Sequence, residues 1–467
     1  GGSWSAVRSQ GTKTSKGSES TGAIPFMKVV DAEMLAFSQG VTRRGSYAGY
    51  LHITHPEIEE FLDIRKATGG DINRKCTNLH HGIVINDKFM EVIHRATKEE
   101  NFDDSWELID PHSNEVKKVV SARTLWVKLL QNRMETGEPY LMFEDAVNQD
   151  LPQFQKKKGL YVNHSNLCSE ITLATNEERT AVCCLSSVNL EYYDEWSKIP
   201  AFIPDLVRML DNVLQYFIDN APEQMERAKY SAMRERSIGL GAMGYHAYLQ
   251  KNSIPFESLG ASAANYTMFK HIKEDALEET RRLAVERGAC PDDDTCEVRN
   301  AHLLAIAPNA SSSIICGNTS PSIEPFRANA YTQKTKSGSF LQKNKYLEAL
   351  LDTKDANTEA VWRDIVSNKG SVQHLEILSE EEKDIFKTAV EINQSWIVEH
   401  AAQRQEFVCQ SQSVNLFFPP DVTKGDLHNV HMLAWAKNLK TLYYLRSEAI
   451  SRADNVSNQV KREIIFE

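Results

Sequence analysis

The sequence lacks long hydrophobic runs, and no apolar stretch approaches the roughly 18 residues that a membrane-spanning helix needs. Its first residues, Gly1-Gly2-Ser3-Trp4-Ser5, contain no hydrophobic segment of the kind found in signal peptides. We therefore predict a cytoplasmic protein with no membrane partner. Cysteine is also scarce, with 8 among 467 residues, which is too few for a disulfide scaffold. In a reducing compartment we expect catalytic or redox roles for such cysteines.

An excess of positive charge is missing as well. The chain has 53 basic and 64 acidic residues and a net charge of −11, which argues against a surface built for nucleic acid. Backbone N–H groups can still bind a small anion. The apolar share of 41% and the charged share of 25% are typical of globular proteins. The first methionine is Met27, so we expect a chain that is incomplete at its N-terminus.

Strand and helix signals alternate along the chain. Residues 1–22, rich in Gly, Ser and Thr, are predicted to form a mobile loop. Predicted helices cover 56–66, 87–97, a segment after 121, a segment from 204, 261–287, 379–402 and 426–439. Predicted strands cover 82–86, 181–190, 301–307, 408–418 and 440–445. This alternation favours one large α/β domain over 1–467, either a barrel or an open sheet.

The segment Ser165-Asn166-Leu167-Cys168-Ser169-Glu170-Ile171 carries the clearest chemical signal. In extended backbone, side chains two apart share a face, so we expect Asn166, Cys168 and Glu170 to project together. A nearby carboxylate disfavours a thiolate, which suits a thiol that stays protonated or reacts as a radical. The same spacing also fits a surface strand with one buried cysteine.

Two further cysteines, Cys183 and Cys184, open the predicted strand 181–190. Alternation places them on opposite faces, so at most one can join Cys168 in a common site. Small buried hydrophobic residues are the alternative interpretation for at least one of them.

Two later segments are weaker signals. Pro308, Asn309, Ala310, Ser311 and Ser312 follow a predicted strand and leave N–H groups and hydroxyls free for an oxyanion, although a simple helix cap uses the same residues. Tyr443 and Tyr444 end the last predicted strand, where adjacent tyrosines usually serve packing.

The basic residues and the possible metal ligands give only weak indications of function. Arg43 and Arg44 lie in a glycine-bounded loop, 40–45, that could approach a phosphate or a base, or be an ordinary solvated loop. No metal site is expected, because the cysteine and aspartate spacings match neither zinc nor calcium sites. We interpret the histidines His52, His55, His80 and His81 as structural or surface residues.

In this order, the segments resemble the large, catalytic subunit of class I ribonucleotide reductase. The motifs are Asn-Leu-Cys-Ser-Glu-Ile at 166–171, the cysteine strand ending in Asn-Leu, the turn at 308–312 with Ser-Ile-Glu-Pro at 322–325, and Leu-Tyr-Tyr at 442–444. The similarity runs from about residue 1 to 447, with a weaker likeness to phage-type members, which would place the protein in a host cytoplasm. The resemblance implies a ten-stranded α/β barrel of two five-stranded halves, with the catalytic cysteine on a central finger loop.

The resemblance also implies roles for residues. Cys168 becomes the thiyl radical that takes the ribose 3′ hydrogen, Glu170 acts as the base on the 3′ hydroxyl, and Asn166 hydrogen-bonds the sugar. Cys183 is one of two cysteines that end as a disulfide, with Cys184 a bystander. The pair that carries the radical to Cys168 is Tyr443 and Tyr444.

Ligands and partners follow from the same resemblance. Residues 308–312 hold the substrate phosphate, 9–20 lie near an effector site at a dimer interface, and Arg43 and Arg44 belong to the loop, 40–49, that relays effector identity to the substrate base. The implied substrates are ribonucleoside diphosphates and the effectors are dNTPs and ATP. The implied partners are a metal-containing, ferritin-like small subunit that generates the radical, thioredoxin or glutaredoxin as reductant, and a second copy of the chain.

The sequence departs from the family pattern at its ends. No cysteine precedes Cys76, so we expect the strand with the family's first redox cysteine to be missing, together with an ATP-binding cone and the C-terminal cysteine tail. We therefore expect a fragment, or one half of a split subunit. Two alternatives stay open: a cobalamin-dependent class II enzyme, against which the tyrosine pair speaks, and a nucleotide-binding fragment without catalysis.

Overall fold

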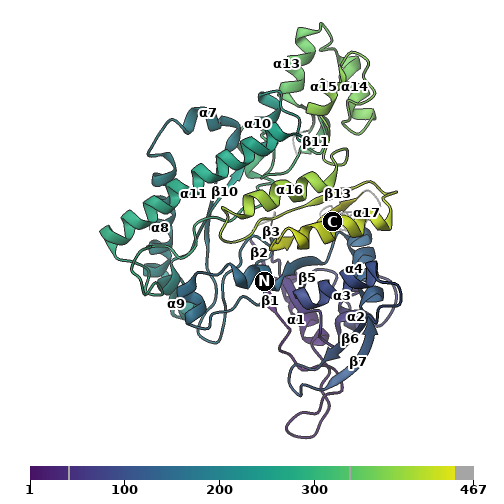
Figure 1. Ribbon diagram of the computed structural model, residues 1–467, viewed down its shortest axis with the longest axis vertical. Coiled ribbons are helices and arrows are strands. Elements are labelled where there is room, and N and C mark those ends of the chain that lie inside the picture. Colours follow the sequence, from purple (N-terminus) through teal and green to yellow (C-terminus); the bar gives the residue numbers. More distant parts are fainter. Residues whose placement is uncertain (40–42, 336–337, 448–467) are drawn as a thin grey trace. The chain divides into compact units, whose positions relative to one another are not determined.

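The computed structural model describes residues 1–39, 43–335 and 338–447, which form two units (Figure 1). The first unit contains 1–151, 161–174 and the chain from 413 onward, and the second contains 152–160 and 175–412. Within the described residues, every helix is too short or too polar to cross a membrane.

A five-stranded sheet forms the centre of the first unit. Its order is β1 (Gly2–Ser3), β4 (Ala48–His52), β5 (His80–Ile85), β8 (Tyr140–Phe143) and β14 (Thr441–Leu442). The first four strands run parallel and β14 is antiparallel to β8. Apolar runs such as Ile83-Val84-Ile85 are buried in this sheet, as expected for parallel strands covered on both faces.

Helices and three smaller strand pairs complete this unit. The helices are α1 (Ile24–Ala36), α2 (Ile58–Phe61), α3 (Asp87–Lys98), α4 (Ala122–Thr136), α5 (Glu144–Gln149) and α17 (Lys424–Ala436), with a 3-10 turn at Ile72–Arg74. The pairs are β2 (Ser38–Gln39) with β3 (Arg43–Arg44), β6 (Ser105–Ile109) with β7 (Val116–Ser121), and β13 (Leu416–Phe418) with β15 (Leu445–Ser447). In Figure 1, α17 lies beside α3 and α4, and Trp126 of α4 donates a hydrogen bond to His428 of α17 at 3.0 Å.

The second unit is mainly helical. Its helices are α6 (Gln153–Lys157), α7 (Tyr193–Trp196), α8 (Phe202–Asn220), α9 (Glu226–Glu235), α10 (Tyr245–Lys251), α11 (Leu259–Arg287), α12 (Ser312–Ile315), α13 (Lys345–Thr353), α14 (Glu359–Ser367), α15 (Glu380–Ile385) and α16 (Gln394–Gln405), with 3-10 turns at Leu190–Tyr192 and Glu223–Met225. Its strands are the parallel pair β9 (Cys184–Asn189) and β10 (Ile238–Met243) and the hairpin β11 (Ala330–Thr335) and β12 (Gly338–Lys343).

Several predicted elements are confirmed. The strand predicted at 82–86 is β5, that at 181–190 is β9, and the helices predicted at 87–97, after 121, from 204, at 261–287 and at 426–439 are α3, α4, α8, α11 and α17. In α3 the side chain of Asn86 caps the first turn, and Phe89, Met90, Ile93 and Ala96 form its buried face.

Other boundaries were wrong for identifiable reasons. The helix predicted at 379–402 is broken between α15 and α16, because Glu391 accepts from the backbone and hydroxyl of Thr388, and Asn393 caps a new helix. The helix predicted at 56–66 shortens to α2. The segment 301–307 forms isolated bridges, Leu240 with Leu304 and Ile306 with Gln412, in place of a strand. Of the strand predicted at 408–418, only β13 forms, and the strand predicted at 440–445 divides into β14 and β15.

Candidate active site

The cysteine segment forms a tight turn and not the extended strand that we predicted. The Asn166 N–H donates to the Ile171 carbonyl at 3.3 Å, and the Asn166 side-chain oxygen accepts from the Ile171 N–H at 3.1 Å. Ser169 has φ of 70°, in the left-handed region that closes such a turn. The turn still brings the side chains of Asn166 and Glu170 into a hydrogen bond, with Cys168 between them in the sequence.

Three hydroxyl groups hold this turn in place. Ser413 donates to the Cys168 carbonyl at 2.6 Å, and Thr441 donates to the Ser169 carbonyl at 3.0 Å. The Tyr50 hydroxyl on β4 lies 2.5 Å from the Ser165 hydroxyl. The cysteine turn is thereby attached to Thr441, two residues before Tyr443, and to Ser413, the residue before Val414, whose carbonyl accepts from the Tyr443 N–H.

Glu170 is the buried carboxyl group of this site, only 2% exposed. Burial raises its pKa above the ordinary value, while hydrogen bonds from Asn166 and Ser413 oppose the rise. A carboxylate with a raised pKa binds a proton more tightly, which is the property of a general base.

Tyr443 and Tyr444 continue from Cys168 as a connected series of side chains. The Tyr443 hydroxyl is hydrogen-bonded to Cys168 and to Tyr444, and the two tyrosine rings lie 4.3 Å apart between centroids. Burial raises the pKa of both phenols, that of Tyr444 to about 12. The structure therefore brings together Asn166, Cys168, Glu170, Tyr443 and Tyr444 within the first unit.

Beyond Tyr444 lies a set of side chains that the sequence analysis missed. Nδ1 of His80 is 3.3 Å from the Tyr444 hydroxyl and 2.6 Å from Oε1 of Glu138. The guanidinium of Arg446 lies 3.9 Å from the centre of the Tyr444 ring, and Tyr140 packs against both tyrosines.

Three of the histidines that we interpreted as structural or surface residues lie beside carboxylates. His80 and His81 both contact Glu138, and His52 contacts Glu144. Glu138 is far from His80 in the sequence, and only the pairing of β5 with the start of β8 brings them together, so no local spacing could reveal the pair.

Cys183 lies in the second unit, directly before β9. Its sulfur accepts a hydrogen bond from the Gln410 side chain at 3.6 Å. Gly239 faces it across the strand pair, since a Cβ built there would lie 3.0 Å from the sulfur. Burial raises the pKa of the neighbouring Cys184.

The turn predicted to bind phosphate lies in the same unit. Asn309 has φ of 51°, and its side chain accepts from Ser187 of β9 at 3.1 Å and donates to Ser312 at 3.2 Å. Ala310 and Ser311 are exposed. The strand β9 thus connects Cys183 at its start with this turn through Ser187.

The two loops predicted to respond to effectors are described in part. Residues 40–42 and the side chain of Arg43 lie outside the described part of the chain, while the Arg44 side chain is exposed. The 9–20 loop is held by Asp110, which accepts from Ser9 and Thr12 at 2.6 to 2.7 Å. Burial pushes the Asp110 pKa upward, but these bonds outweigh it and hold the pKa well below its usual range.

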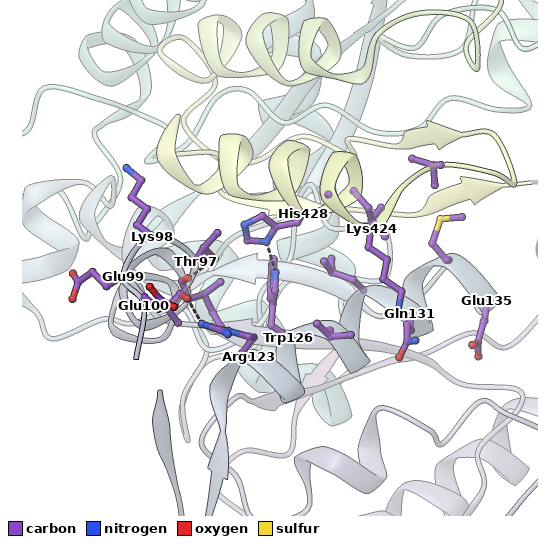
Figure 2. A pocket seen from close by; sticks show the side chains of 18 of the residues that line it. Thr97, Lys98, Glu99, Glu100, Arg123, Trp126, Gln131, Glu135, Lys424 and His428 are labelled. Atoms are coloured by element: carbon purple, nitrogen blue, oxygen red, sulfur yellow. Dashed lines mark hydrogen bonds between the residues drawn. The ribbon is translucent and has the colours of Figure 1, made fainter. Parts of the chain in front are cut away.

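Two of the cavities that the described residues form lie in the first unit. One of about 510 Å³ lies between the 9–20 loop and Phe26 of α1. A larger one of about 890 Å³ lies among α3, α4 and α17, and Figure 2 shows Trp126 pointing to His428 within it. Lys98, Glu99, Glu100, Arg123, Glu135 and Lys424 bring charge to its lining. The predicted site residues are not among the residues that line this larger cavity.

Over the described ranges, His, Cys, Asp and Glu side chains form no group of three or more that could hold a metal ion.

Comparison with known proteins identifies relatives of this chain. The family model of the ribonucleotide reductase barrel domain matches residues 1–297 and 293–445. The putative ribonucleoside-diphosphate reductase large subunit of Frog virus 3 (isolate Goorha) is 50% identical over 449 residues, covering 96% of this chain and 77% of the relative. The corresponding large subunit of Invertebrate iridescent virus 3 is 45% identical over 488 residues, covering 94% and 77%.

Solved structures include a similar fold. The class Id ribonucleotide reductase alpha subunit of Actinobacillus ureae superposes with a TM-score of 0.83 at 36% identity, covering 96% of this chain and 78% of that one. The predicted α/β barrel class is thereby confirmed. The chain belongs to the ribonucleotide reductase large-subunit family and carries its barrel domain.

Proposed function

We propose that this chain reduces ribonucleoside diphosphates to deoxyribonucleoside diphosphates through a thiyl radical on Cys168. The observation that carries the proposal is the connected path from Cys168 through Tyr443 to Tyr444, with rings 4.3 Å apart. A metal-containing, ferritin-like small subunit supplies the oxidising radical. Relatives that share the family carry names as ribonucleoside-diphosphate reductase large subunits.

The burial of the two tyrosines determines how the radical moves. Because burial raises the pKa of Tyr444 to about 12, the phenol is protonated at neutral pH. Its oxidation must therefore remove a proton together with the electron. The same holds for Tyr443, whose pKa burial also raises. The hydrogen bonds between Tyr444, Tyr443 and Cys168 give each proton a short path.

Substrate reduction follows from the groups around the thiol. The Cys168 thiyl takes the hydrogen atom at C3′, and Glu170 takes the proton of the 3′ hydroxyl, which assists loss of the 2′ hydroxyl as water. Two thiols, Cys183 and a second cysteine, supply two electrons and two protons and become a disulfide, after which the hydrogen returns to C3′. Thioredoxin or glutaredoxin reduces that disulfide.

We assign substrate orientation to polar groups of the cysteine turn at 166–171 and of the turn at 308–312. Asn166 hydrogen-bonds the sugar while its side chain also positions Glu170. The turn from Pro308 to Ser312 offers backbone N–H groups and hydroxyls to the diphosphate, supported by the left-handed Asn309 and the exposed Ser311. No positive net charge is needed for this mode of anion binding.

Regulation is assigned to the 9–20 loop. We assign the dNTP or ATP effector to the cavity of about 510 Å³ beside this loop, and we assign Arg43 and Arg44 to the loop that relays its identity to the substrate base. Phe26 lines the cavity and, with Val29, forms an exposed apolar face of α1. This continuity supports a homodimer in which a second copy covers α1. The reaction takes place in the cytoplasm, that of the host for a viral protein.

The experiment that tests the proposal is an assay of diphosphate reduction by the full chain. Radiolabelled CDP is incubated with the chain and a dithiol reductant, with and without a class I small subunit and with and without cobalamin. We expect dCDP only with the small subunit, and none from Tyr443→Phe or Tyr444→Phe. Turnover by both variants with cobalamin alone would indicate the class II mechanism, and CDP binding without product under all conditions would indicate a non-catalytic fragment.

A further inference from the structure

The phenol oxygen of Tyr444 has a polar neighbour that is neither Tyr443 nor Cys168. Nδ1 of His80 lies 3.3 Å from it. The His80 ring stands edge-on to the Tyr444 ring, at 80° and 6.1 Å, and is stacked on Tyr140 at 15° and 6.1 Å. The imidazole therefore has one orientation, with Nδ1 toward Tyr444.

Glu138 explains why the imidazole keeps this orientation. Its Oε1 lies 2.6 Å from Nδ1 of His80, and its Oε2 accepts from the His81 backbone at 3.0 Å and lies 3.2 Å from the His81 ring. The Arg65 guanidinium is 3.4 Å away. Glu138 is only 1% exposed, so this carboxylate is fixed by several donors at once.

The charge of Glu138 determines which ring nitrogen of His80 carries a hydrogen. Burial pushes the pKa of Glu138 upward, but Arg65, His80 and His81 together hold it well below its usual range, so the carboxylate is ionised. An ionised carboxylate can only accept. Nδ1 of His80 therefore carries the hydrogen of the 2.6 Å bond to Glu138, and the same nitrogen lies 3.3 Å from the Tyr444 oxygen.

We propose that His80 is a positioning residue for radical transfer, held by Glu138 so that its Nδ1–H fixes the phenol oxygen of Tyr444. The proposal rests on the proposed radical path. With one side of the oxygen occupied by the imidazole donor, the hydrogen of Tyr444 is directed away from His80 and toward the phenols of Tyr140 and Tyr443. A donated hydrogen bond also stabilises the oxygen of the Tyr444 radical.

The chain offers matched variants. His80→Leu removes the donor, whereas His80→Asn keeps an amide N–H near the place of Nδ1. His52→Leu is the control, because His52 also pairs with a carboxylate, Glu144 at 3.1 Å, and the two imidazoles are similarly exposed, at 19% for His52 and 24% for His80. Since one hydrogen bond of ordinary strength corresponds to about tenfold in a rate, we expect CDP turnover to fall about tenfold in His80→Leu and to recover in His80→Asn.

A spectroscopic measurement separates positioning from a structural role. The full chain with Tyr444 replaced by 3-aminotyrosine is mixed with the small subunit and CDP, and the trapped radical is recorded by electron paramagnetic resonance in H₂O and D₂O. We expect an exchangeable proton coupling from His80 that disappears in His80→Leu and is retained in His80→Asn and His52→Leu.

The outcomes are distinguishable. Identical radical spectra and turnover for His80→Leu and the unsubstituted chain would overturn the assignment of His80 while leaving the radical path intact. Absence of any trapped radical with His80 in place would overturn the proposed radical path, and the assignment with it.

Discussion

At the scale of single residues, the site depends on groups whose surroundings alter their ordinary chemistry. Glu170 has a raised pKa through burial, and the tyrosine pair stays protonated for the same reason. The residue types predicted which chemical groups the site contains, but they did not predict that burial raises the pKa values of these groups. The motif at 166–171 indicated an amide, a thiol and a carboxyl group in one place. It indicated the wrong backbone conformation, because the sequence pattern does not show that Ser169 is left-handed.

The thiol of Cys168 provides the first prediction. Replacing it by a hydroxyl, Cys168→Ser, should abolish dCDP formation, because an alcohol O–H bond is too strong to serve as the hydrogen carrier. Binding of CDP, measured by equilibrium dialysis, should be unchanged, since the turn and its hydrogen bonds remain. Cys296→Ser, which changes an exposed cysteine, is the control and should keep full activity. Product formation by Cys168→Ser would refute its role as the radical residue.

A buried acid in the second unit gives a prediction about pH. Glu235 ends α9, accepts from Gln155 and Ser231, and has a pKa that burial raises to about 7 against the opposing effect of Arg179. The unfolded chain releases this proton near pH 4.3 and the folded chain only near 7. The resulting stability is complete below about pH 4 and is lost as pH rises through 7.

The variant Glu235→Gln should remove this dependence. Between pH 5 and pH 8 the free energy of unfolding of the unsubstituted chain should fall by about 3 kcal/mol relative to the variant. Urea denaturation at both pH values measures the difference. Glu286→Gln, at an exposed ion pair on α11, controls for general charge effects. Parallel pH profiles of the Glu235→Gln variant and the unsubstituted chain would contradict the expectation.

At the scale of elements, periodicity predicted long helices well and short connections poorly. The buried face of α3 repeats at helical spacing, and α11 begins at a Ser258 cap, so both are visible in the sequence. By contrast, the sequences of 301–307 and 408–412 predict strands, yet side-chain amides make some of the hydrogen bonds that a neighbouring strand would make. Gln410 donates to the Ile238 carbonyl at 3.0 Å and Gln412 to the Ala401 carbonyl at 2.8 Å. Such long-range contacts cannot be derived from local pattern.

The attachment of the cysteine turn is a property of two elements and gives the next prediction. The Ser413 hydroxyl lies 2.6 Å from the Cys168 carbonyl and 3.3 Å from the Glu170 carboxylate. Ser413→Ala should lower stability by about 1 kcal/mol and CDP turnover by about tenfold, because a loosened turn misplaces the thiol against Tyr443. Thermal unfolding and steady-state assays measure both.

A matched control separates these two effects. Thr358→Ala removes the hydroxyl that caps α14 and should cost a similar ~1 kcal/mol without changing turnover per folded molecule. Equal losses of turnover in the Ser413 and Thr358 variants would show that global stability, and not the position of the turn, controls the rate.

At the scale of the whole molecule, the proposed function requires the chain to meet other chains. In the proposed function the small subunit delivers an oxidising equivalent at Tyr444, and in the proposed homodimer a second copy covers the exposed face of α1. Phe26 and Val29 on that face are 54% and 65% exposed, and Phe26 also lines the proposed effector cavity. The proposed effector site and the proposed dimer contact therefore share Phe26, and we expect effector binding to strengthen the dimer.

The last prediction tests this coupling with Val29→Glu. In a twofold-symmetric interface each substitution occurs twice, so two apolar contacts are lost and two carboxylates are placed in the same interface. We expect the dimer to weaken by about 100-fold. Analytical ultracentrifugation with and without dTTP measures the dissociation constant of the dimer. Val285→Glu is the control, because Val285 on α11 is also an exposed valine, at 91% exposed. A dimer that withstands Val29→Glu and dissociates with Val285→Glu would place the interface on the second unit instead.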